Sequence, residues 1–224
     1  MAAVIRIPVQ DVPPIGRTEA TKLARAEYER FLALLRALGP DDWDRPTDCT
    51  RWTVKDVAAH VISTPQIGWR QMPGMVLRNL GRGYNTLIFR EVKRRSERET
   101  RESILADFER FATSTHHVPT TTSVEPLMDV LVHHQDIVRP LGLRRAMPPA
   151  AAAAAADRSR TLSLLMGSRR VVRGTRMVAT DVDWARGSGP TITGPAQELL
   201  MLCSGRSPDP DLVSGDGLAL LATR

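Results

Sequence analysis

Apolar residues recur at helical spacing through most of the first 146 residues. Residues 1–16 lack this periodicity and predict an extended lead-in. Residues 18–38 place alanines, leucines and a phenylalanine near one face, and Gly39 ends the pattern. A second helix is predicted after Thr53, because Thr53 and Asp56 have the spacing of a capping box and apolar residues follow at helical intervals. Each helix therefore has one face to bury.

Two further helical regions complete a predicted bundle. One lies between residues 84 and 115, and its charged segment 90–103 is typical of either a solvated helix face or a turn between helices. The other begins at Ser123 and stops at Pro140. Four helices of this kind predict an antiparallel four-helix bundle over residues 1–146.

The pattern changes after residue 146. An alanine run predicts a helix that continues to residue 166. Apolar and polar residues alternate over 169–184, which predicts a strand. TITG at 191–194 predicts another strand after a turn. A short helix is predicted over 195–205. Residues 147–224 therefore predict a small α+β domain, so the expected fold class is α+β with a helix bundle followed by this domain.

Composition and charge narrow the class of protein. Hydrophobic residues make up 42% of the chain but aromatic residues only 4%, which favours a core of alanine, leucine and valine. The net charge is +6, yet the arginines are scattered and glutamates interrupt the basic segment 90–103, so we expect no nucleic-acid partner. No apolar stretch approaches about 18 residues and no leader pattern is evident, so we expect no membrane partner and a cytoplasmic location.

The cysteines and tryptophans suggest structural roles. Cys49 and Cys203 are far apart in the sequence, which argues against a disulfide, and we expect both to be small buried hydrophobes. Trp52, Trp69 and Trp184 can line a pocket but are more typical of core packing.

The fourth predicted helix carries a polar stripe. Asp129 and His133 are four residues apart, and Asp136 and Arg139 follow at three-residue steps, so all four lie on one side of the helix. A stripe of this kind can enter a core only if its polar groups find partners or a metal. We expect Asp136 and Arg139 to form a structural ion pair that orients the helix. His134 should lie either next to the ligands without binding the metal itself or at the surface, pointing away from the site.

Asp129 and His133 can supply two ligands of a metal site. His60 is the best candidate for the third ligand, because it lies in the apolar register of the second helix. Two imidazoles and one carboxylate suit zinc, or a ferrous, nickel or manganese ion. The alternative is purely structural: a hydrogen-bonded carboxylate–imidazole pair on one helix, and a core histidine at position 60.

Four segments in this order resemble the mycothiol-dependent maleylpyruvate isomerase family of the DinB-like helix-bundle superfamily. The resemblance implies a bundle that binds a divalent metal, typically zinc, and a small α+β domain after it. By motif, His60 matches the first histidine ligand, Asp129 the carboxylate and His133 the second histidine. The segments are DDWDRPTDCTRWTVKDVAAHV, DVLVHHQDIVRPLG, VATDVDWARGSGPTITGPAQELL and SGDGLALL.

Asp129 departs from the pattern of this family, which has glutamate at the carboxylate position. Aspartate is one methylene shorter, so it ligates directly only if the helix lies closer or the metal shifts. The implied function is a metal-dependent isomerase or thiol transferase that uses mycothiol on a small electrophilic substrate. The alternative is a non-catalytic metal-binding or ligand-binding member. A homodimer is left open.

An anionic substrate would favour a guanidinium near the metal. The candidates, by residue type alone, are Arg82, Arg139, Arg173 and Arg176.

Overall fold

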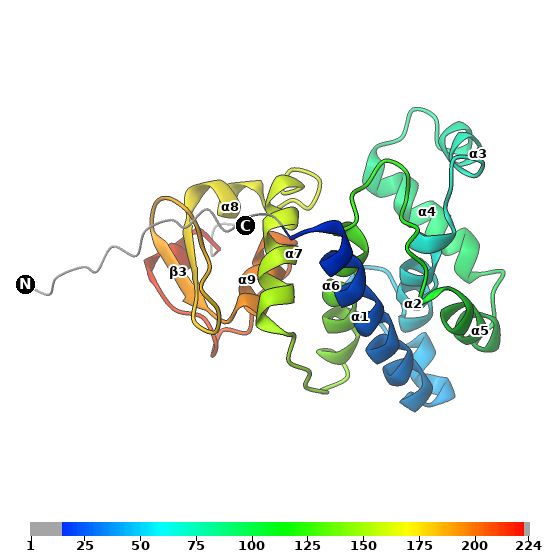
Figure 1. Cartoon of the computed structure of the whole chain (residues 1–224), viewed down its shortest axis with the longest axis horizontal. Coiled ribbons are helices and arrows are strands. Elements are labelled where there is room, and N and C mark those ends of the chain that lie inside the picture. Colours follow the sequence, from blue (N-terminus) through cyan, green and yellow to red (C-terminus); the bar gives the residue numbers. More distant parts are fainter. Residues whose placement is uncertain (1–14, 222–224) are drawn as a thin grey trace, which may run out of the picture. The chain divides into compact units, whose positions relative to one another are not determined.

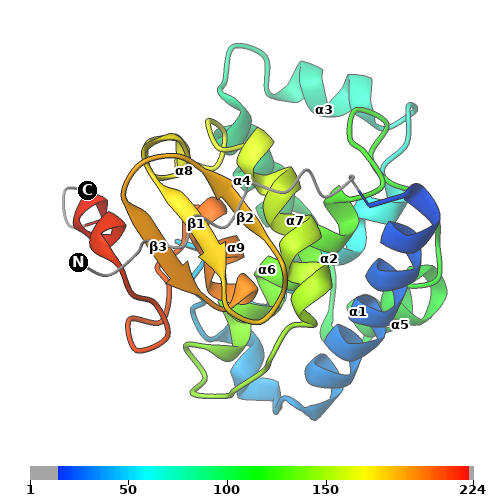
Figure 2. The same cartoon turned by 60° about the vertical axis from the view of Figure 1, so that its left-hand side comes forward.

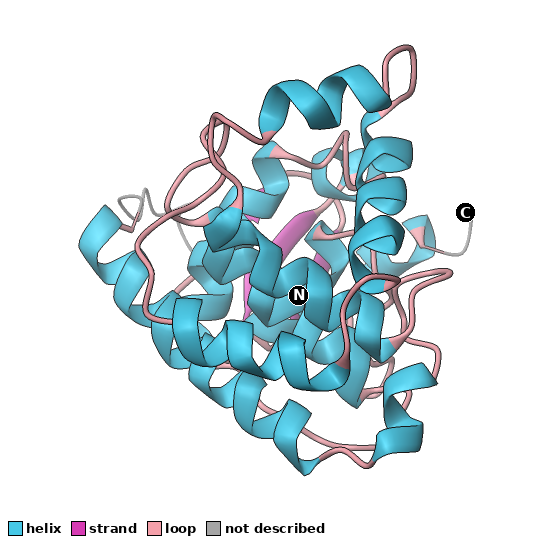
Figure 3. Ribbon diagram, turned by 90° about the vertical axis from the view of Figure 1, so that its right-hand side faces the viewer, coloured by secondary structure: helices cyan, strands magenta, loops and turns pink. Residues whose placement is uncertain are grey.

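The computed structural model describes residues 15–221, and helices make up most of this part of the chain (Figure 3). The predicted extended lead-in falls largely on residues 1–14, which lie outside the described residues, as do residues 222–224. The chain forms two compact units, residues 15–147 and residues 148–221. The α+β fold class expected from the sequence is confirmed. The predicted boundary after residue 146 stays a prediction about where independently folding domains begin.

Four helices of the first unit pack around one another as a bundle (Figure 1). They are α1 (Arg17–Ala37), α2 (Val54–Ser63), α5 (Arg101–Phe111) and α6 (Glu125–Val138). Helices α1 and α2 each contact both α5 and α6, so the four helices enclose one core. Its largest fully buried side chains are Phe31, Leu35, Ile62, Ile104, Phe108, Leu127, Leu131 and Ile137.

The third predicted helical region, residues 84–115, forms two helices, α4 (Tyr84–Ser96) and α5. Helix α4 packs on α2. The short α3 (Met72–Arg78), which precedes this region, packs on α4. Thr100 caps the start of α5, because its hydroxyl accepts a hydrogen bond from the Ser103 backbone N–H at 3.2 Å. The charged segment 90–103 therefore contains a turn between helices. None of the described helices combines the length and the apolar character needed to cross a bilayer.

The predicted capping box at the start of α2 is confirmed. Thr53 Oγ1 accepts a hydrogen bond from the Asp56 backbone N–H at 3.3 Å, and Asp56 Oδ2 accepts one from the Thr53 backbone N–H at 2.9 Å. The same carboxylate forms an ion pair with Lys93 of α4. Asp56 therefore fixes the start of the helix that carries His60 and ties it to α4.

The second unit pairs a small sheet with helices (Figure 2). The strand order is β2-β1-β3, with β1 (Arg176–Ala179) antiparallel to β2 (Ala185–Gly187) and parallel to β3 (Thr191–Gly194). Helix α9 (Ala196–Cys203) contacts β1 and β3 and also packs against α7 (Pro149–Thr161). The 3₁₀ turn η3 (Asp216–Leu220) lies against β3.

Two sequence predictions for the second unit are wrong. Residues 162–167 form turns rather than the end of a helix, and Gly167 adopts a positive φ of 71° that a helix does not allow. Residues predicted to begin a strand form α8 (Arg169–Gly174). The two valines of this segment are adjacent, so their spacing fits either period, and burial of both side chains selects a helix that packs on α9.

We expect Asp56→Asn to lower the free energy of unfolding at neutral pH by about 1–2 kcal/mol, because it removes the ion pair with Lys93. Burial works to raise the pKa of Asp56, but the Lys93 ammonium and hydrogen bonds from Ser96 and Thr53 outweigh it and hold this pKa below its usual value. The contribution is therefore present above the unfolded-state pKa of about 3.9 and is lost as the pH falls through the lower folded-state value.

Urea unfolding across this pH range checks the expectation. The difference between wild type and Asp56→Asn should narrow below about pH 4. Asp44→Asn, at an exposed position, is the matched control and should change stability by less than about 0.5 kcal/mol. A difference that stays constant across the range would show that the Asp56 charge does not stabilise the fold.

Candidate metal site

The structure brings the three predicted ligands together in the core of the first unit. Asp129 and His133 lie one turn apart on α6, and His60 lies near the end of α2. Asp129 Oδ1 lies 3.2 Å from His60 Nε2 and 3.4 Å from His133 Nε2. One ligand atom from each residue falls within 4.8 Å of the others. Helix packing therefore unites residues that are far apart in the sequence.

This cluster has the donor atoms and the spacing that a divalent cation requires. In a tetrahedral zinc site with bonds of about 2.0–2.1 Å, neighbouring ligand atoms lie about 3.3 Å apart. Asp129 Oδ2 is buried and has no hydrogen-bond partner among the described residues. A buried carboxylate oxygen without a partner is costly, and a bound cation would satisfy it. The shorter aspartate side chain still reaches both histidines.

Asp136 orients His133 from the far side of the imidazole. His133 Nδ1 lies 2.8 Å from Asp136 Oδ2, and the Asp136 side chain is fully buried. An imidazole that donates through Nδ1 keeps its ring oriented, so that a metal which displaces the Nε2 proton would bind at Nε2. The predicted role of Asp136 in orienting the helix therefore includes a direct contact with a candidate ligand. Arg139 Nε donates to Gln135 Oε1 at 3.1 Å.

The charges of Asp129 and of the two histidines stabilise one another. Burial works to lower the pKa of His133, but the charge of Asp129 and hydrogen bonds to Asp129 and Asp136 raise it to about 9. Burial works to raise the pKa of Asp129, but the charges of His60 and His133 hold it far below its usual range. Asp129 is therefore a carboxylate at neutral pH, which is the form that ligates a metal.

Trp52 forms an aromatic wall beside both histidines. Its ring is stacked on His133 with centroids 5.7 Å apart, and it lies at a steep angle to His60 with centroids 5.0 Å apart. Trp52 and Trp184 are buried as core packing predicts, whereas Trp69 is 71% exposed. The sequence pattern did not indicate that Trp52 touches the site, because the loop before α2 has no periodicity from which its direction could be read.

Cys49 also lies beside the cluster, which corrects the expectation of a buried hydrophobe. Its side chain is half-buried, and its sulfur forms a second group of potential ligands with His133 and Asp136. The loop carrying it is anchored to α6, because the Asp48 backbone N–H donates to the Asp136 carbonyl at 2.9 Å. Cys203 is fully buried as expected, and burial raises the pKa of its thiol to about 12.

His134 is not at the surface, which was one of the two positions that the sequence allowed. Its side chain is buried, and its ring packs edge-on against Phe31 of α1 with centroids 5.3 Å apart. Burial, with a smaller effect from the charge of Arg30, lowers the pKa of His134 to about 4. His134 is enclosed because α1 packs against the side of α6 that carries it. His134 is therefore a neutral core residue.

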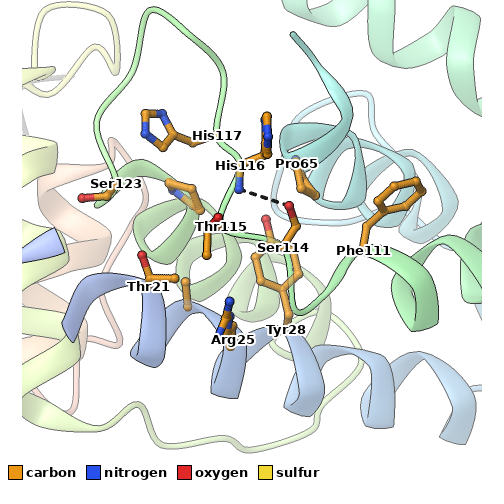
Figure 4. Close-up of a pocket in the computed structure, with 12 residues that line it drawn as sticks. Thr21, Arg25, Tyr28, Pro65, Phe111, Ser114, Thr115, His116, His117 and Ser123 are labelled. Atoms are coloured by element: carbon orange, nitrogen blue, oxygen red, sulfur yellow. Dashed lines mark hydrogen bonds between the residues drawn. The ribbon is translucent and has the colours of Figure 1, made fainter. Parts of the chain in front are cut away.

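A small cavity lies between α1 and the loop after α5 (Figure 4). Thr21, Arg25 and Tyr28 line it from α1, and His116 and His117 line it from the loop. Its volume of about 10 Å³ holds roughly one water molecule. Burial and the charge of Asp129 raise the pKa of Tyr28, whose hydroxyl donates to the Val61 carbonyl at 3.3 Å.

The fold and the cluster define a helix-bundle protein with two histidines and a carboxylate in its core. Residues 24–125 match the family model described as the mycothiol maleylpyruvate isomerase N-terminal domain. The predicted resemblance to this family is therefore confirmed over this part of the chain. His60 lies inside the matched residues, whereas Asp129 and His133 lie beyond them. No protein with a curated description matches the sequence.

Two solved structures are similar to nearly the whole chain. The crystal structure of the mycothiol-dependent maleylpyruvate isomerase is 14% identical with a TM-score of 0.61, and the match covers 90% of this chain and 93% of that chain. The crystal structure of a histidine-to-alanine mutant of the mycothiol-dependent maleylpyruvate isomerase is 13% identical with a TM-score of 0.60 and the same coverage. At these identities the similarity establishes a shared fold.

The contact of Trp52 with both histidines predicts a spectroscopic response to metal. We expect Co²⁺ to quench the share of the tryptophan emission that comes from Trp52, because a paramagnetic ion between the imidazoles would lie close to its ring. Trp52→Phe should lose this quenching, while the exposed Trp69→Phe control should keep it. Fluorescence titration measures the effect. Equal quenching in wild type and Trp52→Phe would place the bound ion elsewhere.

Proposed function

We propose that this protein is a metal-dependent enzyme that uses mycothiol to isomerise a small electrophilic substrate or to transfer the thiol to it. The proposal is supported by the N-terminal domain family and by the fold shared with a mycothiol-dependent maleylpyruvate isomerase. The observation that carries it is the Asp129 carboxylate, which lies between two imidazoles and has one buried oxygen without a partner among the described residues.

His60, Asp129 and His133 would hold the metal. Three protein ligands that leave further positions open are typical of catalytic zinc, and zinc is the ion we favour. Bound there, a divalent ion would stabilise the thiolate of mycothiol near neutral pH and so provide the nucleophile. Neither cysteine of the chain is needed for this step.

Other residues of the chain would support the reaction without contacting the metal. Asp136 fixes the ring of His133 through Nδ1. Trp52 covers one side of both imidazoles and keeps water from that side. Tyr84 begins α4 with half of its side chain exposed, and burial together with the charges of Asp129 and Glu125 raises its pKa. Its hydroxyl therefore stays protonated and can donate a hydrogen bond to an anionic substrate.

The chemistry follows from the nucleophile. A thiolate that adds to a conjugated cis double bond converts it to a single bond, which can rotate. Expulsion of the same thiolate then restores the double bond in the trans arrangement, with no net change in atoms. If the substrate carries a leaving group instead, the thiolate displaces it and the product keeps the thiol.

A non-catalytic metal-binding or ligand-binding role is the second candidate. Two observations favour it: the carboxylate position has aspartate where the isomerase pattern has glutamate, and the family match ends before Asp129 and His133. In this case the cluster would bind an ion without thiol-dependent turnover. The cytoplasmic location and a homodimer stay predictions.

Metal content and thiol-dependent turnover, measured on the same samples, test the proposal. We expect about one zinc ion per chain and mycothiol-dependent conversion of maleylpyruvate or another electrophile. His133→Ala should lose the metal and lower turnover by about 100-fold or more. His116→Ala removes an exposed histidine of the same unit and should behave as wild type.

The two candidates give different results. Zinc binding without turnover of any electrophile would support the non-catalytic role. Turnover that survives both a chelator and His133→Ala would contradict the metal-dependent mechanism.

A further inference from the structure

The second unit contains a basic pocket of about 640 Å³ that the proposed reaction does not use. Its lining residues come from the end of α7, from helix α8 and from the turn after β2, all within this unit. The residues that matter to the argument are Arg160, Thr161, Arg169, Arg173 and Ser188. We call this set and the space it surrounds the arginine pocket. Its volume is within the range of small-molecule sites.

The one acidic residue that lines the arginine pocket is already neutralised. Asp157 Oδ1 accepts hydrogen bonds from Trp184 Nε1 at 3.1 Å and from Arg186 Nε at 2.8 Å. Asp157 Oδ2 accepts a second bond from the same guanidinium at 2.9 Å. Both carboxylate oxygens are therefore engaged by the Arg186 guanidinium, which is not one of the pocket's arginines.

The three arginines of the pocket have no acidic partner among the described residues. Arg169 and Arg173 lie one turn apart on α8, so their exposed side chains share one face. Arg160 comes from α7 and is partly buried, with Nη1 3.8 Å from the sulfur of the buried Met177. Three positive charges thus surround one concavity without compensation, although like charges repel one another.

We propose that the arginine pocket binds a small organic polyanion that carries phosphate groups. Guanidinium groups bind phosphate through two parallel hydrogen bonds, and Thr161 and Ser188 add hydroxyl donors at the rim. Partial burial of Arg160 strengthens its attraction to an anion, because the surrounding dielectric is lower than that of water. The arginines come from two helices and surround one open hollow instead of following a stripe, which favours a small molecule over a nucleic-acid backbone.

This site is independent of the histidine cluster. None of its residues belongs to the proposed metal site, and the proposed thiol chemistry requires no phosphate. The inference therefore stands or falls separately from the proposed function. Arg173 was an anion-binding candidate from its residue type alone, and the pocket now supplies the neighbours that the sequence did not show.

Calorimetric titration of the full chain with inorganic pyrophosphate tests the proposal. We expect saturable binding to the wild type that weakens as salt is added. The double variant Arg169→Gln/Arg173→Gln should weaken it by at least about tenfold. The control is Arg170→Gln, which removes one positive charge from the same helix but from outside the pocket, and it should change the affinity by less than about twofold.

Further titrations distinguish an organic polyanion from inorganic phosphate, and a specific pocket from a diffuse charge effect or DNA binding. A nucleoside diphosphate that competes with pyrophosphate and binds more tightly than inorganic phosphate would support an organic polyanion. Equal weakening for each charge removed, in the double variant and in Arg170→Gln, would instead indicate a diffuse charge effect and overturn the proposal. So would an absence of binding to the wild type, or duplex DNA that binds more tightly than every small phosphate. Thermal unfolding confirms that the exposed substitutions leave the fold intact.

Discussion

The first unit depends on holding the Asp129 carboxylate between two imidazoles, with one of its oxygens shielded from water. An isolated carboxylate there would cost several kcal/mol, so its neighbours must compensate for the charge. His60 and His133 do so directly, and Asp136 in turn holds His133. One oxygen of Asp129 remains without a partner. A metal ion bound to this oxygen would supply the missing partner, so the packing of the bundle and the proposed chemistry depend on the same residue.

Several contacts outside the cluster serve to hold it in place. The capping box and ion pair of Asp56 fix the start of α2, which carries His60. The loop before α2 is anchored to α6 through the Asp48 backbone and packs the ring of Trp52 over both histidines. A site built on helices supported in this way keeps its geometry better than one built on loops. The two units also differ in chemistry, since the first has a buried anion and the second an uncompensated basic pocket.

Much of the bundle could be predicted because its helices are amphipathic and its polar stripe has helical spacing. Asp129 and His133 are separated by one turn, and His60 lies in the apolar register of α2. These two features were enough to predict that the three residues lie close together. Features that depend on tertiary packing were missed. His134 is buried because Phe31 of α1 packs against it, which no property of its own helix indicates.

The other differences have three causes: irregular backbone, ambiguous residue spacing and contacts between separate elements. The approach of Cys49 and Trp52 to the cluster depends on a loop in which Arg51 adopts a positive φ of 70°, and residue spacing does not reveal such a conformation. The segment that forms α8 contains only two adjacent valines, which fit a helix or a strand equally well. The arginine pocket needs residues from α7, α8 and a turn, so only the folded arrangement makes it visible.

X-ray absorption spectroscopy of the zinc-loaded protein, without added thiol, tests the central claim most directly. His133 belongs to two groups of potential ligands, one with His60 and Asp129 and one with Cys49 and Asp136. Our account predicts a first shell of nitrogen and oxygen atoms alone, at about 2.0–2.1 Å. A sulfur ligand at about 2.3 Å would show that Cys49 binds the ion, and it would contradict the assignment of His60, Asp129 and His133.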